Sequence, residues 1–149
     1  MKPFLYYALS ALIVLTFFPC DQPETGELLN VPTDETYSLA FQVDSLISAV
    51  VFCNECNGQY EAGTDGSISV ALLGCTKIYC GESRIQDIFP LALEGAMTWS
   101  IVGDKLTIEY GYLEENGLLN FESGGLFDNK DVLPIVGVLW KLSSIQLDG

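Results

Sequence analysis

Two closely spaced pairs of cysteines constrain this chain more than any other feature. Cys53 and Cys56 form a C-x-x-C, and Cys75 and Cys80 form a wider couple about twenty residues later. This arrangement fits a zinc site, a thiol redox site or two structural disulfides. The second couple is wider than a usual zinc knuckle, and Glu55 disfavours the thiolate that a redox site needs. We therefore favour two disulfides, and the residues alone leave all three possible connectivities open.

The first twenty residues have the layout of a secretory signal. Lys2 precedes an apolar run over residues 4–18, which is short for a membrane span and typical of a signal peptide. The run closes at Cys20, which looks like the cysteine of a bacterial lipobox, although Pro19 stands where a small residue is usual. Cys20 is also the odd cysteine of five. We expect residues 1–20 to be a signal peptide and Cys20 to be lipidated, with an uncleaved anchor or later cleavage as the alternative.

The segment after Cys20 is acidic and has little apolar periodicity. Residues 21–36 carry two prolines and five acidic side chains, which is typical of a flexible tether. A chain exported and acylated in this way is expected in the cell envelope, with the outer membrane as the favoured layer. We therefore expect the membrane to be a partner, through the lipid on Cys20, and disulfides to form in that compartment.

Charge and composition exclude several classes of function. The chain of 149 residues has 20 Asp and Glu against 6 Lys and Arg, a net charge of −14, so we expect no nucleic-acid partner. It has no histidine, so it forms neither a Ser-His-Asp triad nor an imidazole-rich metal site. Its carboxylates are typical of solvated surface charge. We therefore expect no enzymatic activity, no cofactor and no metal.

The body of the chain, residues 37–149, predicts a mainly β domain. Short β-rich runs alternate with turn residues, and Gly103-Asp104 between two such runs predicts a hairpin. The run over 46–52 is almost continuously apolar, as in a strand buried on both faces. The expected strands are 37–43, 46–52, 58–62, 67–73, 97–102, 105–110, 118–121 and 136–147.

One segment breaks the strand pattern. Residues 82–94 place apolar side chains at helical spacing, with Ser83 as a candidate N-cap. Pro90 inside this segment predicts a short or kinked helix, or one that begins near the proline. One helix among many strands predicts an antiparallel curved sheet or a partly closed barrel, with the helix over one open end.

A set of short motifs surrounds the cysteines. The sequence reads Cys53-Asn54, then Gly58-x-Tyr60, and further on Thr76-x-x-x-Cys80. These motifs resemble the META domain family, the group that includes the bacterial heat-shock protein HslJ, over about residues 37–112. The resemblance implies an antiparallel sheet rolled toward a barrel with one helix across it. It implies no established reaction, cofactor or substrate.

The resemblance also implies a disulfide pairing. Cys53 and Cys80 occupy the two family cysteine positions, so they are expected to pair, which leaves Cys56 with Cys75 as an inner bridge. The family usually has glycine where Phe52 stands, so the geometry of that turn is left open.

The other motif residues are expected to be structural rather than ligands. Asn54 is expected to bond its own backbone at a turn, and Gly58 to supply an unusual φ. Tyr60 is expected to fill the core while its hydroxyl finds a partner, and Thr76 belongs to the same structural motif.

One family feature is displaced. The family's opening strand, Gly-x-x-Trp-x-Leu, is absent before Tyr37, but a similar pattern runs from Gly137 to Leu142 around Trp140. Circular permutation, the start of a second domain and chance each account for it. Because an unfilled slot would expose a sheet edge, we expect residues 136–147 to complete the sheet.

These observations predict a non-catalytic envelope lipoprotein domain with a structural or interaction role, in connection with stress tolerance. The alternative is a binding module for a small molecule or a partner chain, at the barrel mouth or at a sheet edge. An open apolar pocket with a few convergent polar groups would favour binding, and a mouth filled by side chains would favour the structural role.

Overall fold

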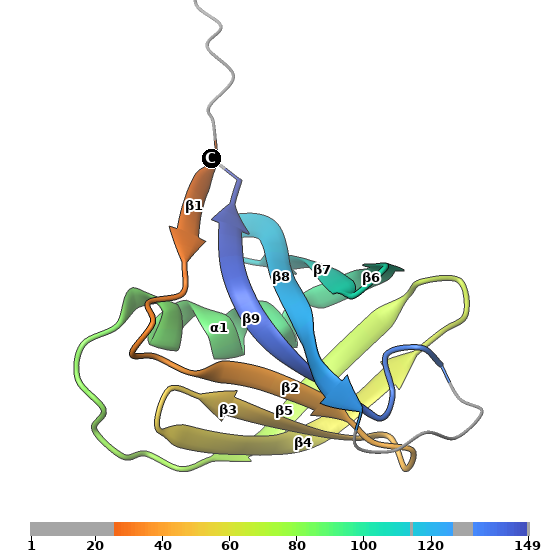
Figure 1. The fold of residues 1–149 in the computed structure, drawn as a ribbon, viewed down its shortest axis with the longest axis horizontal. Helices are drawn as coiled ribbons and strands as arrows, with labels where there is room; N and C mark the ends of the chain where they lie inside the picture. The colour runs from red at the N-terminus through yellow and green to blue at the C-terminus, as the bar shows by residue number, and fades with distance from the viewer. Residues whose placement is uncertain (1–25, 114, 127–132, 149) are drawn as a thin grey trace, which may run out of the picture.

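The computed structural model describes residues 26–113, 115–126 and 133–148, and within them it has nine strands and one helix (Figure 1). The expected signal peptide and Cys20 lie outside these residues. The strands are β1 (Glu27–Asn30), β2 (Tyr37–Phe41), β3 (Leu46–Val51), β4 (Asn54–Ala62), β5 (Ile68–Cys75), β6 (Ala96–Val102), β7 (Lys105–Tyr112), β8 (Glu115–Leu126) and β9 (Val138–Leu147), and the helix is α1 (Arg84–Glu94).

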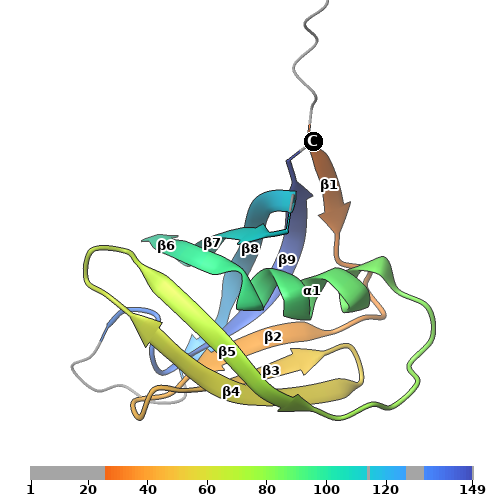
Figure 2. The ribbon, with the colours of Figure 1, turned by 180° about the vertical axis from the view of Figure 1, so that it is seen from behind.

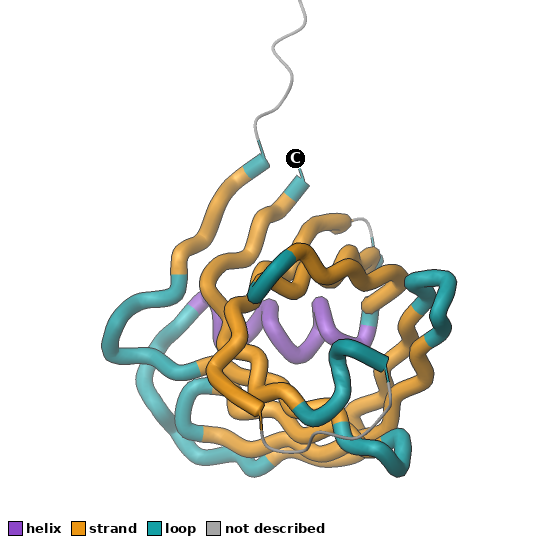
Figure 3. The backbone as a smooth tube through the Cα atoms, turned by 45° about the vertical axis from the view of Figure 1, so that its right-hand side comes forward, coloured by secondary structure: helices purple, strands orange, loops and turns teal. Residues whose placement is uncertain are grey.

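The strands form one antiparallel sheet in the order β5-β4-β3-β2-β9-β8-β7-β6, with β1 also paired to β9. The sheet curls until its two edges meet at one point, where Ser67 bridges Thr98 and the Trp99 N–H donates to the Gly66 carbonyl at 2.8 Å. In Figure 3 the strands form a ring with α1 across its opening. The predicted fold class is confirmed: this is a nearly closed barrel with an unsealed seam and one short helix.

The core fills the inside of this barrel. Strand residues alternate between buried and more exposed positions, as expected of a sheet with one face on the core. In β3, Ile47, Ala49 and Val51 are buried while Ser48 and Val50 are half-buried. The prediction of a strand buried on both faces is therefore wrong, because no residue that the structure describes covers the outer face of β3 completely.

Helix α1 follows β5 and contacts β3, β5 and β7 (Figure 2). The Ser83 side chain caps it by accepting from the Gln86 N–H, as predicted. Pro90 lies inside the helix, so the alternative of a helix beginning near the proline is wrong. Proline removes one helical hydrogen bond, but Phe89 and Leu93, on either side of it, are fully buried and hold the turn in place.

The segment expected to be a tether contains part of the fold. Strand β1 pairs with β9 from Glu27–Leu147 to Asn30–Ser144, and Glu27 forms an ion pair with Arg84 of α1 at 2.6 Å. The prediction of a flexible tether is therefore wrong for β1. The acidic composition of this segment did not indicate a strand, and the partner of β1 lies near the other end of the chain.

The Trp-x-Leu pattern lies in β9, between β2 and β8. Trp140 is buried and donates from Nε1 to the Ile135 carbonyl at 3.0 Å. Strand β9 therefore completes this sheet, as expected. The hairpin around Gly103-Asp104 is also present, between β6 and β7.

Candidate functional site

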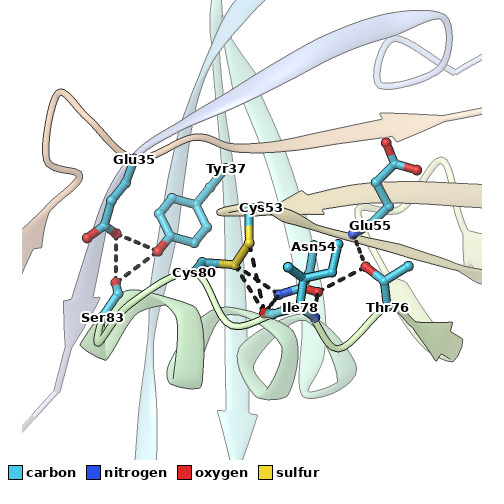
Figure 4. Close-up of a disulfide and its surroundings, with 9 residues drawn as sticks. All are labelled: Glu35, Tyr37, Cys53, Asn54, Glu55, Thr76, Ile78, Cys80 and Ser83. Carbon is cyan, nitrogen blue, oxygen red and sulfur yellow. Dashed lines mark hydrogen bonds between the residues drawn. A yellow bond between two sulfur atoms is a disulfide. The ribbon is translucent and has the colours of Figure 1, made fainter.

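The family motif residues meet where the β3–β4 turn faces the loop that joins β5 to α1 (Figure 4). The Cys53–Cys80 disulfide ties the turn to the far end of that loop, with the two Cα atoms 5.7 Å apart. Cys56 and Cys75 are direct neighbours in the β4–β5 ladder and form the second disulfide. Both expected pairings are present. These four sulfurs are therefore not free thiolates that could hold zinc.

Asn54 is the polar centre of this region. It is buried, and its Nδ2 donates to the Ile78 carbonyl at 2.9 Å and lies 3.2 Å from Cys80 Sγ. Its Oδ1 accepts from the Ile78 N–H at 2.6 Å and from Thr76 Oγ1 at 3.0 Å. The expectation that Asn54 bonds its own backbone is wrong, because it supplies the partners that the irregular backbone of the facing loop lacks.

Thr76 extends the contact between β4 and the loop. Its Oγ1 accepts from the Glu55 N–H at 3.0 Å, and its own N–H donates to the Glu55 carbonyl at 2.9 Å. With the bond to Asn54, the Thr76 hydroxyl both donates and accepts. Its role in the structure is to continue the strand pairing beyond the end of β5.

Gly58 and Tyr60 lie further along β4 and serve the packing of the sheet. Gly58 does not have a positive φ, so that expectation is wrong; a Cβ atom there would instead collide with the Ala71 carbonyl at a bulge in the β4–β5 pairing. Tyr60 packs edge-to-face on Phe41 at 4.9 Å, and its hydroxyl donates to the Gln42 carbonyl at 2.8 Å. Burial raises the pKa of Tyr60 above its ordinary value.

A second polar cluster joins the β1–β2 connection to the start of α1. Tyr37 Oη and Ser83 Oγ both donate to Glu35 Oε2, at 2.5 and 2.7 Å, and the two hydroxyls lie 2.9 Å apart (Figure 4). Burial raises the pKa of Tyr37 far above its ordinary value, and the hydrogen bond to Glu35 adds to this. Sequence reasoning assigned Glu35 to the tether and missed this cluster; only the N-cap Ser83 gave a signal.

An open groove of about 600 Å³ separates the disulfide-bonded loop from α1. Its rim includes Ile78 and Tyr79, whose side chains are 59% and 84% exposed. Gln86 lines the helix side, and its buried Oε1 has no hydrogen-bond partner among the described residues. The remaining lining residues are Val51, Asn54, Cys56, Cys75, Thr76, Lys77, Asp87, Pro90 and Leu91.

The remaining motif residue, Trp140, lies in β9 and does not join this site. Within the described residues, no three His, Cys, Asp or Glu side chains come together as a metal site. In that same part of the chain, no helix is long and apolar enough to cross a membrane.

Comparison with known proteins adds one finding. The model of the META domain family matches residues 23–123, which is 101 of the 149 residues. This match begins before β1, ends within β8 and leaves β9 outside it. No curated protein and no solved structure matches the chain. With the predicted motifs, the two disulfides and the barrel-like sheet now placed, the chain belongs to the META domain family.

Proposed function

We propose that this META domain is an exported, lipid-anchored and non-catalytic domain of the cell envelope, with a structural or interaction role. The observation that carries the proposal is that the family motif uses its chemical groups internally. Asn54 and Thr76 direct their side chains at the adjoining loop, and the four cysteines are joined in disulfides. The motif therefore presents no reactive group to a substrate.

Two features support export to an oxidising compartment. Structural disulfides are typical of secreted and envelope proteins, and here they close loops of 27 and 19 residues. The apolar run that ends at Cys20 supplies both a signal and a site for a thioether-linked lipid. A role in stress tolerance fits these cross-links, because they preserve the fold under denaturing conditions. The outer membrane is the envelope layer that we propose for the lipid anchor.

The test is the intact mass of the chain purified from the membrane fraction of a bacterial host, with and without reduction and thiol alkylation. We expect a chain that begins at an acylated Cys20 and takes up four alkyl groups only after reduction. The matched control is Cys20→Ala, which should leave the membrane fraction and keep both disulfides. A chain without an acyl group, or with thiols that alkylate before reduction, contradicts the proposal.

A second candidate function is binding in the groove between the loop and α1. The observation that favours it is the unpartnered Gln86 Oε1 inside an apolar groove, which is a common combination in binding sites. An environment-sensitive apolar dye tests this candidate. Ile78→Asp should reduce dye binding about tenfold, while Val102→Asp, which changes an exposed side chain remote from the groove, should not. Equal dye binding by both variants excludes this function.

A further inference from the structure

The chain enters the fold at the same end of the barrel as the turn between β7 and β8. Gly26 lies against Leu147 at the end of β9, and the Asp148 N–H donates to the Asn116 carbonyl in β8. At this end the strands lie side by side in the order β1, β9, β8 and β7. Leu113 directly follows β7, at the turn to β8. Figures 1 and 2 show the start of β1 beside the end of β9 at one end of the molecule.

The choice of leucine at position 113 is what the fold does not explain: the two-residue loop between the paired Tyr112 and Glu115 requires a positive φ there, which glycine or asparagine adopts more easily. The Leu113 side chain is 89% exposed, more than any other large apolar residue described, and its φ is +55°, which is unfavourable for leucine. Phe52 also has a positive φ, but its half-buried ring packs against Tyr37. A strained residue without an internal contact points to a role outside the fold.

Leu113 forms part of a continuous apolar surface. Together with Leu91 of α1 and Tyr112 of β7 it lines an open hollow of about 590 Å³, beside Glu115. Leu91 is itself 40% exposed. We call these three side chains, Leu91, Tyr112 and Leu113, the Leu113 surface.

With an anchor at or near Cys20, the short chain before β1 would keep this end of the domain close to a membrane. The apolar run over residues 4–18 ends two residues before Cys20, and only residues 21–25 separate Cys20 from Gly26. Six fully extended residue steps span about 20 Å. Gly26 would therefore lie within about 20 Å of the bilayer, whether Cys20 carries a lipid or the apolar run remains as an anchor.

We propose that the Leu113 surface rests on the lipid bilayer that holds the amino-terminal anchor. This inference rests on the proposed function, because it requires that the chain be anchored at or near Cys20. Glu115 and Asp148 leave this end with net negative charge, because the ion pair with Arg84 offsets the charge of Glu27. The contact is therefore apolar and fits a zwitterionic lipid surface, whereas an anionic surface would repel the domain.

The test places a photoreactive benzoylphenylalanine at position 113 of the full chain, reconstituted in phosphatidylcholine vesicles. The matched control carries the same group at Val102, which is 79% exposed and lies at the other end of the β6–β7 hairpin. Eight residues of strand place the two positions about 27 Å apart. We expect several-fold more lipid adduct at position 113 than at 102, and less adduct when phosphatidylglycerol is added.

A second variant guards against a local effect of the bulky probe. In this variant the probe stands at position 112 and Leu113 is changed to asparagine, which also accepts a positive φ. It should give about tenfold less lipid adduct than the same probe at position 112 beside the parent Leu113. Equal labelling at 113 and 102, adducts between two copies of the chain, or labelling that rises with phosphatidylglycerol overturns the inference.

Vesicle flotation separates the two proposals. If the chain floats with the vesicles but position 113 gives no excess of lipid adduct, the docking surface is wrong and the anchor stands. If the chain does not float, the anchor itself is wrong, and this inference falls with it.

Discussion

The two halves of the sheet are stabilised in different ways. We call β2–β5 and the loop to α1 the cross-linked half, and β6–β9 the packed half. Two of the strands in the cross-linked half, β2 and β3, have only five and six residues, whereas β8 and β9 have 12 and 10. Both disulfides and the Asn54 cluster lie in the cross-linked half. The cross-linked half therefore adds covalent and polar links to its apolar burial, whereas the packed half combines apolar burial with two long strands.

Reduction of both disulfides should have the largest effect on stability, because it removes the covalent links of the cross-linked half. The 27- and 19-residue loops are nested, and releasing both should lower the free energy of unfolding by roughly 5 kcal/mol in the chain-entropy model. Urea denaturation with and without a phosphine reductant measures the difference. Unchanged midpoints after complete reduction would show that the cross-linked half does not depend on its links.

A core truncation should have the largest effect of a single substitution in the packed half. Ile108 is fully buried in β7, and Ile108→Ala should cost about 3 kcal/mol because it leaves a cavity. Lys105→Ala, at an exposed position of the same strand, is the control and should change stability by less than about 0.5 kcal/mol. Equal effects of the two substitutions would contradict a stability based on apolar burial.

The matching substitution in the cross-linked half is Asn54→Ala. It leaves the Ile78 N–H and carbonyl without their partner, so we expect a loss of about 2 kcal/mol, measured by urea denaturation. Asn57→Ala changes an exposed residue of the same strand and should be nearly neutral. If the disulfides alone position the loop, Asn54→Ala will resemble this control.

Alkaline pH should weaken both halves through buried tyrosines. Burial, with the nearby charges of Glu115 and Asp148, raises the pKa of Tyr110 to about 12, and the pKa of Tyr37 is raised still further. An unfolded tyrosine titrates near pH 10, so above that pH the unfolded chain loses protons that the folded chain keeps. Stability is therefore complete below about pH 10 and falls between pH 10 and 12, by about 1.4 kcal/mol per pH unit for each tyrosine.

Substitution to phenylalanine distinguishes these two tyrosines. The Tyr110 hydroxyl has no hydrogen-bond partner among the described residues, so Tyr110→Phe should be neutral or slightly stabilising at pH 7. Tyr37→Phe should cost about 1 kcal/mol at pH 7, because Glu35 and Ser83 lose a partner. Both variants should fall less steeply than the parent above pH 10 in pH-dependent urea titrations, and an unchanged slope would contradict the assignment.

The smallest expected effects come from the two apolar residues with positive φ. Leu113→Gly should stabilise the domain by about 0.5–1 kcal/mol, because it removes strain without removing an internal contact. Phe52→Gly relieves the same strain but loses the ring against Tyr37, so the two changes should nearly cancel. Thermal denaturation of the two variants compares them directly, and a destabilising Leu113→Gly would show a contact that the fold requires.

Local signals in the sequence were sufficient for much of the fold. The hairpin at Gly103-Asp104 and the N-cap Ser83 are each set by neighbouring residues, and both were predicted. The disulfide pairing required the family resemblance, since spacing alone allowed three connectivities.

What the sequence did not reveal depends on contacts between distant segments. Strand β1 has four residues, and its partner β9 lies at the other end of the chain, so no local pattern marks it. The groups that bond the Asn54 side chain, and Ser83, which bonds Glu35, come from the loop before α1, whose path is irregular. The groove follows from the spacing of that loop and the helix, which no local motif encodes.

The position of β1 has a mechanical consequence. A pull on the amino terminus reaches β1 first, and the four residues of β1 pair only with β9, whereas β2 pairs with strands on both sides. Under load β1 would peel away from β9 one residue pair at a time, while the β2–β9 pairing keeps the rest of the sheet together. The eight residues 27–34 span about 25 Å when fully extended, which limits the length of chain that this peeling can release. Strand β1 would thus act as a releasable link between the domain and whatever holds its amino terminus.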